Sequence, residues 1–269
     1  MDNYLLKQEV IGNYRINIFQ DDSPSCPCTD WDMLGVHLFN YDDSDRLSSA
    51  CNGDEVSATS LEDALRELVC KYVPQKKIID YINEYCNDYR IRYDRSDHMW
   101  YLEHYGKYTW SDEVWHEANS FSPHELKFCD YSDEFCDILD SDDLIWLLHN
   151  CQRKIAFHEW QSRGYSQGDC ADGISFCTRE RFAKRYGKPG KDWRERAVKS
   201  MESEVDCIGK WLWGDVIGYV LEKKVYTFLQ PEDCEEWEEI DSCWDYYCGP
   251  DELIENVVNE HDIRPKEAA

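Results

Sequence analysis

The sequence of 269 residues has no run of about 18 apolar residues, and its first ten residues lack the apolar core of a signal peptide. Neither a membrane-spanning helix nor a secretion signal is therefore expected. These absences predict a protein that stays inside the cell, in the cytoplasm.

Basic residues are scarce. The chain has 29 Lys and Arg against 56 Asp and Glu, which gives a formal net charge of −27. Nucleic-acid backbones and anionic membranes both require a basic surface, so the charge argues against direct binding to either. Only a locally basic segment could still bind nucleic acid or an anionic membrane, and residues 179–199 are the single candidate. Its basic residues include Arg181, Lys184, Arg185, Lys188, Lys191, Arg194 and Arg196.

The 14 cysteines include no Cys-x-x-Cys pair. The close spacings are Cys26-Pro-Cys28 and the looser pairs Cys129/Cys136, Cys170/Cys177 and Cys243/Cys248. Because structural zinc sites need regular Cys or His spacing, we expect no zinc and no other cofactor. In a reducing compartment the cysteines are expected to be free thiols that pack as small apolar side chains, without disulfides.

Familiar catalytic patterns are also missing. There is no phosphate-binding loop, dinucleotide-binding glycine pattern, nucleophile elbow or zincin helix. His158, Glu159, Asp169 and Asp172 can be grouped as a carboxylate–histidine metal site, but their spacing is unspecific, and satisfied or exposed histidines are the favoured interpretation. These absences favour a protein that is not an enzyme.

A packed core is nevertheless expected, because 42% of the residues are apolar and 14% are aromatic. Alternating residues predict a strand at 13–19 and a second around Gly35, at 31–39. Ser60 is suited to cap a helix that begins at Leu61 and ends before Pro74, and a second amphipathic helix is expected at 78–85.

The second half of the sequence predicts further helices at 130–143 and 192–211, with a buried apolar segment at 144–148. A β-hairpin is expected from 216–221 and 225–229, turning at 222–224. No internal repeat or low-complexity linker is present. The predicted fold is therefore a single composite α+β domain, 1–269, with a C-terminal helix and β-hairpin unit and a possible subdivision into 1–125 and 126–269.

Three segments combine glycine with aspartate, at 168–173, 214–218 and 241–249. If the chain brings Asp169, Asp172, Asp215 and Asp241 together, they can hold a divalent cation. One hypothesis is therefore a metal-dependent enzyme or a ligand-binding protein. Capping and turn formation account for the same residues without any ligand.

Five local patterns resemble an uncharacterised family of proteins encoded by phages and other mobile elements. They are Trp31-Asp32-Met33-Leu34-Gly35, Gly168 to Phe176 with Tyr186-Gly187, Glu204-Val205, Leu212 to Tyr219, and Asp241-Ser242-Cys243-Trp244 with Gly249. The resemblance implies a mobile-element setting and no particular activity. The sequence departs from the family pattern at Met33, where Asn is usual, and at Asp245 and Cys248.

The targets of a mobile-element protein include host or defence enzymes that bind nucleic acid in basic clefts. An acidic protein can occupy such a cleft by placing carboxylates where phosphates would lie, since acids four residues apart on a helix rise by about 6 Å. The leading hypothesis is thus an inhibitor that mimics nucleic acid. A structural or regulatory interaction protein is the other non-enzymatic possibility.

Two acidic segments without Lys or Arg are the candidate partner-binding residues. The first contains Asp130, Asp133, Glu134, Asp137, Asp140, Asp142 and Asp143. The second contains Glu232, Asp233, Glu235, Glu236, Glu238 and Glu239. The alternative interpretation is a solvated helix surface and a charged loop, which need no partner.

Overall fold

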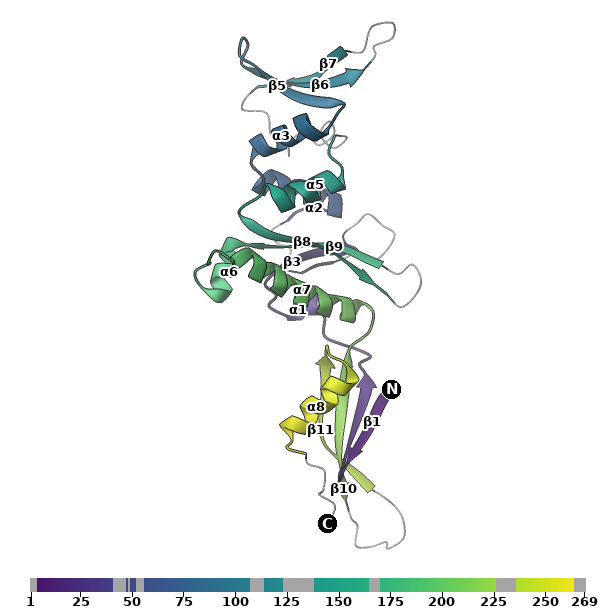
Figure 1. Ribbon diagram of the computed structural model, residues 1–269. Helices are drawn as coiled ribbons and strands as arrows, with labels where there is room; N and C mark the ends of the chain where they lie inside the picture. The colour runs from purple at the N-terminus through teal and green to yellow at the C-terminus, as the bar shows by residue number, and fades with distance from the viewer. Residues whose placement is uncertain are drawn as a thin grey trace. The chain divides into compact units, whose positions relative to one another are not determined.

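The computed structural model describes residues 4–40, 47, 49–51, 56–106, 114–122, 138–164, 170–225 and 236–263 (Figure 1). The strands are β1 Leu5–Ile11, β2 Tyr14–Gln20, β3 Val36–Asn40, β4 Ser49–Cys51, β5 Tyr89–Asp94, β6 Met99–Gly106, β7 Val114–Phe121, β8 Ile155–Arg163, β9 Cys170–Thr178, β10 Ile217–Val225 and β11 Glu236–Tyr246. The helices are α1 Pro27–Asp30, α2 Leu61–Tyr72, α3 Gln75–Tyr85, α5 Ser141–Asn150, α6 Arg179–Tyr186, α7 Trp193–Leu212 and α8 Pro250–Glu260.

The fold is α+β, as predicted. Its strands form three sheets with the orders β1-β2-β10-β11, β4-β3-β9-β8 and β5-β6-β7. The chain divides into two compact units. Unit 1 comprises residues 1–33, 162–169 and 203–269, and unit 2 comprises 34–161 and 170–202. A single domain is not confirmed, and that part of the expectation stays a prediction.

Unit 1 is a four-stranded sheet with helix α8 on one face (Figure 1). Apolar residues alternate along the two central strands, and their side chains on the helix side form the core with α8. This core contains Ile16, Ile18, Ile217, Tyr219, Leu221, Leu253, Ile254, Val257 and Ile263. Helix α8 was not predicted, because the helix expected beside the strand pair is 192–211, which corresponds to α7. An antiparallel strand pair was predicted, but its second strand was expected at 225–229 and is β11 instead.

The turn of that strand pair was predicted in the wrong place. Residues 222–224 lie inside β10, and the connection to β11 falls in 226–235, outside the described residues. The charges fit the strand because each has a neighbour across the sheet. Arg15 Nε donates to Glu222 Oε2 over 2.5 Å, which lowers the pKa of Glu222, and Lys223 lies in register with Glu238.

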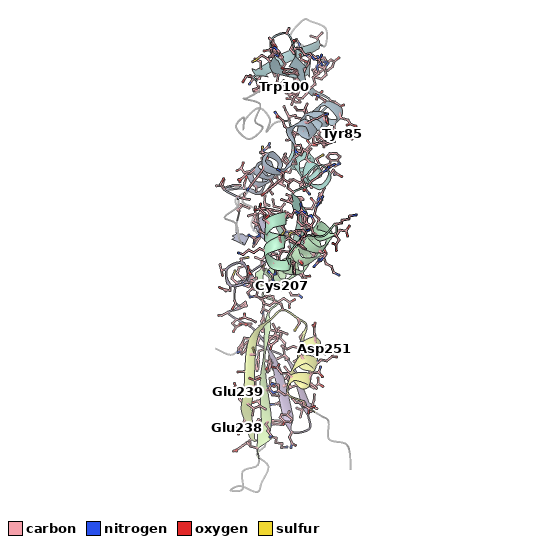
Figure 2. The ribbon with its side chains drawn as sticks, turned by 90° about the vertical axis from the view of Figure 1, so that its left-hand side faces the viewer. Tyr85, Trp100, Cys207, Glu238, Glu239 and Asp251 are labelled. Atoms are coloured by element: carbon pink, nitrogen blue, oxygen red, sulfur yellow. The ribbon has the colours of Figure 1, made fainter. Side chains whose placement is uncertain are left out.

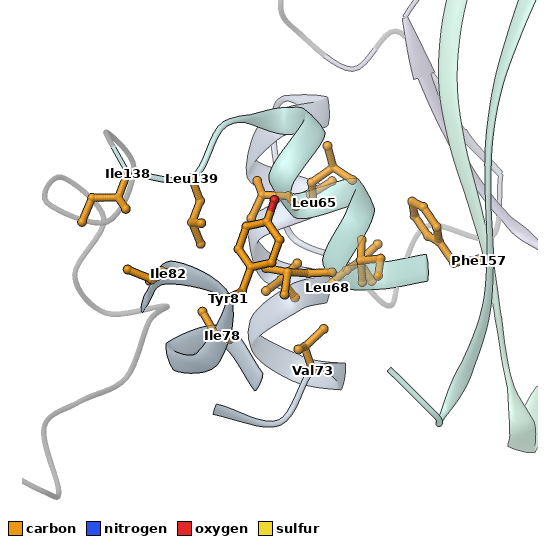
Figure 3. Packing of buried hydrophobic residues seen from close by; sticks show 14 of the residues in the cluster. Leu65, Leu68, Val73, Ile78, Tyr81, Ile82, Ile138, Leu139 and Phe157 are labelled. Carbon is orange, nitrogen blue, oxygen red and sulfur yellow. The ribbon is translucent and has the colours of Figure 1, made fainter. Parts of the chain in front are cut away.

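Unit 2 is built in layers. Helices α2 and α5 lie between α3 and one face of the β4-β3-β9-β8 sheet (Figures 1 and 3). The fully buried side chains of Leu68, Ile82 and Leu147 join these helices, and Ile91 extends the same core to β5. The opposite face of the sheet packs against α6 and the first part of α7 in a separate core that includes Met201.

Several helices match the sequence prediction closely. Ser60 caps α2 by accepting a hydrogen bond from the backbone N–H of Asp63 at 3.1 Å, and α2 ends at Tyr72, before Pro74. Helix α3 contains the amphipathic segment predicted at 78–85, and α7 matches the helix predicted at 192–211. In each case a strong apolar stripe agrees with the tertiary packing, and in α2 a side-chain cap agrees with it as well.

The expectation of free thiols throughout is wrong. Cys28 and Cys70 are each disulfide-bonded. A disulfide needs Cβ atoms about 4 Å apart, and tertiary packing sets this distance, which the spacing of cysteines along the chain does not reveal. The free cysteines among the described residues are Cys26, Cys86, Cys151, Cys177, Cys207, Cys243 and Cys248.

Candidate partner-binding site

The first acidic segment is described only from residue 138 onward, so Asp130, Asp133, Glu134 and Asp137 lie outside the described residues. The predicted helix at 130–143 is wrong at 138–140, which form a turn and a bend, and α5 begins at Ser141. Of the segment 144–148, which was expected to be buried, Leu144, Leu147 and Leu148 lie in the core, but Trp146 is 40% exposed because the segment is part of helix α5, only one side of which faces the core.

The described acids of this segment have structural roles. Asp140 is the N-cap of α5 and accepts the backbone N–H of Asp143 at 2.9 Å, while Asp143 accepts the backbone N–H of Asp140 at 3.2 Å. Asp143 also accepts the hydroxyl of Tyr81 at 2.6 Å. Asp142 lies in the first helical turn, where a negative charge is favourable. Helix capping therefore accounts for these three acids without a partner.

This capping role leads to a direct prediction. Asp140→Ala should lower the free energy of unfolding by about 1 kcal/mol, because it removes the N-cap hydrogen bond. Urea denaturation followed by circular dichroism measures this loss. Asp140→Asn, which keeps an N-cap acceptor, should retain most of the stability, and equal losses in both variants would contradict the capping role.

The second acidic segment ends in a strand. Glu232, Asp233 and Glu235 lie outside the described residues, whereas Glu236, Glu238 and Glu239 belong to β11 and are exposed (Figure 2). Glu238 lies opposite Lys223, and Glu239 lies opposite Glu222. Alternation along a strand therefore places Glu238 on the sheet face that carries α8, and Glu239 on the other face.

Acids that the sequence interpretation missed continue this surface. Residues 236–263 contain ten Asp and Glu and no Lys or Arg. On α8 the buried residues are Leu253, Ile254 and Val257, so helical periodicity places Asp251, Glu252 and Glu255 on the outward face. The sequence contained a signal for these acids, because no Lys or Arg occurs anywhere between residues 236 and 263. We call the exposed acids on the α8 side the β11–α8 acidic surface, which comprises Glu236, Glu238, Asp251, Glu252, Glu255, Glu260 and Asp262. Glu239 is exposed on the opposite face of the sheet and lies outside this surface.

A hydrogen-bond network joins the end of α8 to the middle of β11. Asp241 Oδ2 accepts from the Tyr219 hydroxyl at 2.6 Å and from His261 Nε2 at 2.9 Å. The Tyr219 hydrogen bond is the main reason that the pKa of Asp241 is lowered, and the His261 bond adds to it. Tyr219 is 2% exposed, so the network ties the acidic strand and helix to the core of unit 1.

Tyr219→Phe should destabilise unit 1 by about 1 kcal/mol near neutral pH, since it removes a hydrogen bond to a carboxylate that is partly screened by solvent. Because the pKa of Asp241 is lowered in the folded state, this stabilisation is present above the unfolded carboxyl pKa of about 3.9 and is lost as pH falls through the folded value. The difference between wild type and variant in urea unfolding should therefore shrink at about pH 3. A difference that is constant with pH would contradict the network.

The four aspartates of the glycine–aspartate segments are divided between unit 1, unit 2 and residues outside the described ranges. Asp169 lies outside them, Asp172 belongs to unit 2 and accepts from Gln161 Nε2 at 2.9 Å, and Asp215 and Asp241 belong to unit 1. Within the described ranges, no group of three or more His, Cys, Asp or Glu side chains could hold a metal ion.

The proposed carboxylate–histidine set meets a similar difficulty. His158 and Glu159 are adjacent on β8, so their side chains point to opposite faces of the sheet. Partial burial lowers the pKa of His158, which keeps its ring neutral near pH 7. Partial burial beside the core of the sheet therefore accounts for His158 without a bound metal.

The fold is that of an acidic α+β protein, and eight of its exposed carboxylates lie on β11, on α8 or just beyond α8 in unit 1. No helix among the described residues is long and apolar enough to cross a membrane. Comparisons of the chain with protein-family models, curated proteins and solved structures found no match.

Proposed function

We propose that this protein binds a basic partner protein through the β11–α8 acidic surface and competes there with nucleic acid. The observation that carries the proposal is the lack of any Lys or Arg among residues 236–263, which hold ten acids. Eight of these acids are exposed on β11, on α8 or just beyond it. A protein cleft that is lined with Lys and Arg to bind phosphates is complementary to such a surface.

The spacing of the acids supports mimicry of a phosphate backbone. Glu236 and Glu238 are two residues apart on a strand, a rise of about 6.8 Å. Asp251 and Glu255 are four residues apart on a helix, a rise of about 6 Å, although Asp251 also forms an ion pair with Lys7. The net charge of −27 would also speed the encounter with a basic cleft. Unit 1 itself would not contact nucleic acid, since like charges repel.

The resemblance to mobile-element proteins supports a host or defence enzyme that binds nucleic acid as the partner, and the host cytoplasm as the compartment. Disulfides persist mainly in oxidising compartments, so the two disulfide-bonded cysteines test this placement. A cytoplasmic location requires that the bonds at Cys28 and Cys70 be reduced in cells, because a reducing compartment opposes them, and alkylation in intact cells should then label both residues as thiols. Mass spectrometry that finds both residues protected until a reductant is added would place the protein elsewhere.

Affinity capture tests the proposed function. The full chain is immobilised and exposed to host lysate at about 50 mM salt, and the retained proteins are then eluted with a DNA duplex or an RNA strand. We expect the main retained protein to be a basic nucleic-acid-binding protein that the nucleic acid releases. Release by salt but not by nucleic acid would mean that the partner binds the acidic surface electrostatically but not at its nucleic-acid site. Retention that neither salt nor nucleic acid reverses would refute both the electrostatic binding and the mimicry.

A further inference from the structure

Unit 2 carries the one segment in which the charge balance is reversed. Residues 179–199 contain nine Lys and Arg and three Asp and Glu, although acids outnumber bases by 56 to 29 in the whole chain. The structure places this segment on α6, the following loop and the first turns of α7. Its exposed cations are Arg179, Lys184, Arg185, Lys188, Lys191, Arg194, Arg196 and Lys199.

The turn between α5 and β8 extends this surface. The backbone N–H of Arg179 donates to the carbonyl of Lys154 at 3.3 Å, so the exposed Arg153 and Lys154 lie beside the start of α6. A groove of about 440 Å³ opens between this turn and α7. Its polar lining consists of His149, Gln152, Arg194, Glu195, Lys199 and Glu202. We call the eight exposed cations together with Arg153 and Lys154 the α6–α7 basic surface.

Helix stability does not explain all of these cations. Lys184 and Arg185 lie in the last turn of α6, where positive charge is favourable. Arg194 and Arg196, by contrast, lie in the first turn of α7, where the helix dipole disfavours positive charge and favours an anion. A bound anion would offset this cost.

An exposed aromatic ring lies within the same surface. The guanidinium carbon of Arg196 is 5.6 Å from the ring centroid of Tyr186, and Tyr186 is 47% exposed. The guanidinium lies over one face of the Tyr186 ring, and an exposed cation–aromatic pair of this kind is suited to stack with nucleobases. Among polyanions, nucleic acid offers both phosphates for the cations and flat bases for this pair.

We propose that the α6–α7 basic surface binds the phosphate backbone of a single-stranded nucleic acid, with Tyr186 and Arg196 stacking on its bases. This goes beyond the proposed function, which concerns unit 1 and a protein partner. The net charge of the chain argues against nucleic-acid binding, but this surface of unit 2 is locally positive and can bind nucleic acid. The exposed ring favours a single strand, because the bases of a duplex are already stacked.

Fluorescence anisotropy with a labelled 20-nucleotide DNA strand, the matching RNA and the DNA duplex tests the proposal on the full chain. We expect the single strands to bind more tightly than the duplex, with an affinity that falls as salt rises. Lys188→Gln/Lys191→Gln should weaken binding and reduce the slope of log K against log salt by roughly two. Tyr186→Ala should weaken single-strand binding, whereas Glu195→Gln, which removes an acid from the groove, should strengthen it.

The matched control is Arg163→Gln/Lys223→Gln, which removes two exposed cations from unit 1 and changes the net charge equally. It should leave binding to the strand unchanged, and equal weakening by both double variants would overturn the proposal. The proposal would also be overturned if the wild-type protein did not bind the strand at low salt. It would be overturned as well if sedimentation showed that the basic surface binds a second copy of the chain instead. Because Lys188→Gln/Lys191→Gln leaves the β11–α8 acidic surface intact, capture of a basic protein by this variant separates the two proposals.

Discussion

Gly173→Ala is expected to lower the free energy of unfolding by about 2–3 kcal/mol, the largest stability loss that we predict for a single methyl group. A Cβ atom on Gly173 would overlap the indole ring of Trp160, which lies directly over this position of β9. Trp160 is 9% exposed and its Nε1 donates to Ser175 Oγ at 2.8 Å, so the ring cannot move away without breaking that bond. Ser175 Oγ is also 2.7 Å from His37 Nδ1, and both residues are fully buried.

Urea denaturation followed by tryptophan fluorescence and circular dichroism measures the effect. Gly249→Ala is the matched control, because no atom lies within 4 Å of a Cβ built there and Gly249 has an ordinary backbone conformation. Gly249 is the N-cap of α8, where Ala is less favourable than Gly, so this control should lower the stability by less than about 1 kcal/mol. If Gly173→Ala unfolds like the control, the close contact between β9 and Trp160 is incorrect, and the sheet that underlies α6 and α7 must pack differently.

Reversing three acids of the β11–α8 acidic surface should weaken binding to the captured basic partner by about 100-fold. The variant Glu238→Lys/Glu255→Lys/Glu260→Lys places positive charges against a basic cleft, and like charges across an interface cost several kcal/mol. The fold should survive, because all three residues are exposed and because Glu260 lies in the last turn of α8, where a cation is favourable. Glu238→Lys sets a lysine opposite Lys223, but both positions are exposed, so the cost of this repulsion is small. Isothermal titration calorimetry gives the affinity, and circular dichroism checks the fold.

Reversal of three exposed acids in unit 2, Asp80→Lys/Glu117→Lys/Glu159→Lys, produces the same net charge and serves as the control. We expect it to slow association modestly, through the weaker overall field, while the dissociation rate stays unchanged. Equal losses of affinity in the two variants would mean that total charge drives binding and that the β11–α8 acidic surface has no special role.

Local signals in the sequence were sufficient for much of the fold. Helices α2 and α7 combine a strong apolar stripe with clear ends, and β2 alternates as a half-buried strand does. The strand position of 222–224 was missed, because the cross-strand partners that accommodate Glu222 and Lys223 come from β2 and β11, far away in sequence. The disulfide bonding of Cys28 and Cys70 was missed as well, because the spacing of cysteines in a sequence does not show which of them come within bonding distance.

The candidate site was predictable in part. The acidic run at 232–239 led to Glu236, Glu238 and Glu239, all exposed on β11. The acids of α8 were overlooked because they are interspersed with the apolar residues of an amphipathic helix, so that they do not form a run. Asp140 and Asp143 were assigned to a partner surface because a capping box cannot be distinguished from a charged helix face until the start of the helix is known.

Hydrogen–deuterium exchange of the full chain with and without its captured basic partner tests the central claim most directly. If the partner occupies the β11–α8 acidic surface, amide exchange should slow within residues 236–263, and this protection should disappear when salt is raised, because ionic strength screens the attraction. Peptides from unit 2 should exchange at the same rate in both states. Protection confined to unit 2, or protection of 236–263 that persists at high salt, would contradict binding by charge complementarity at this surface.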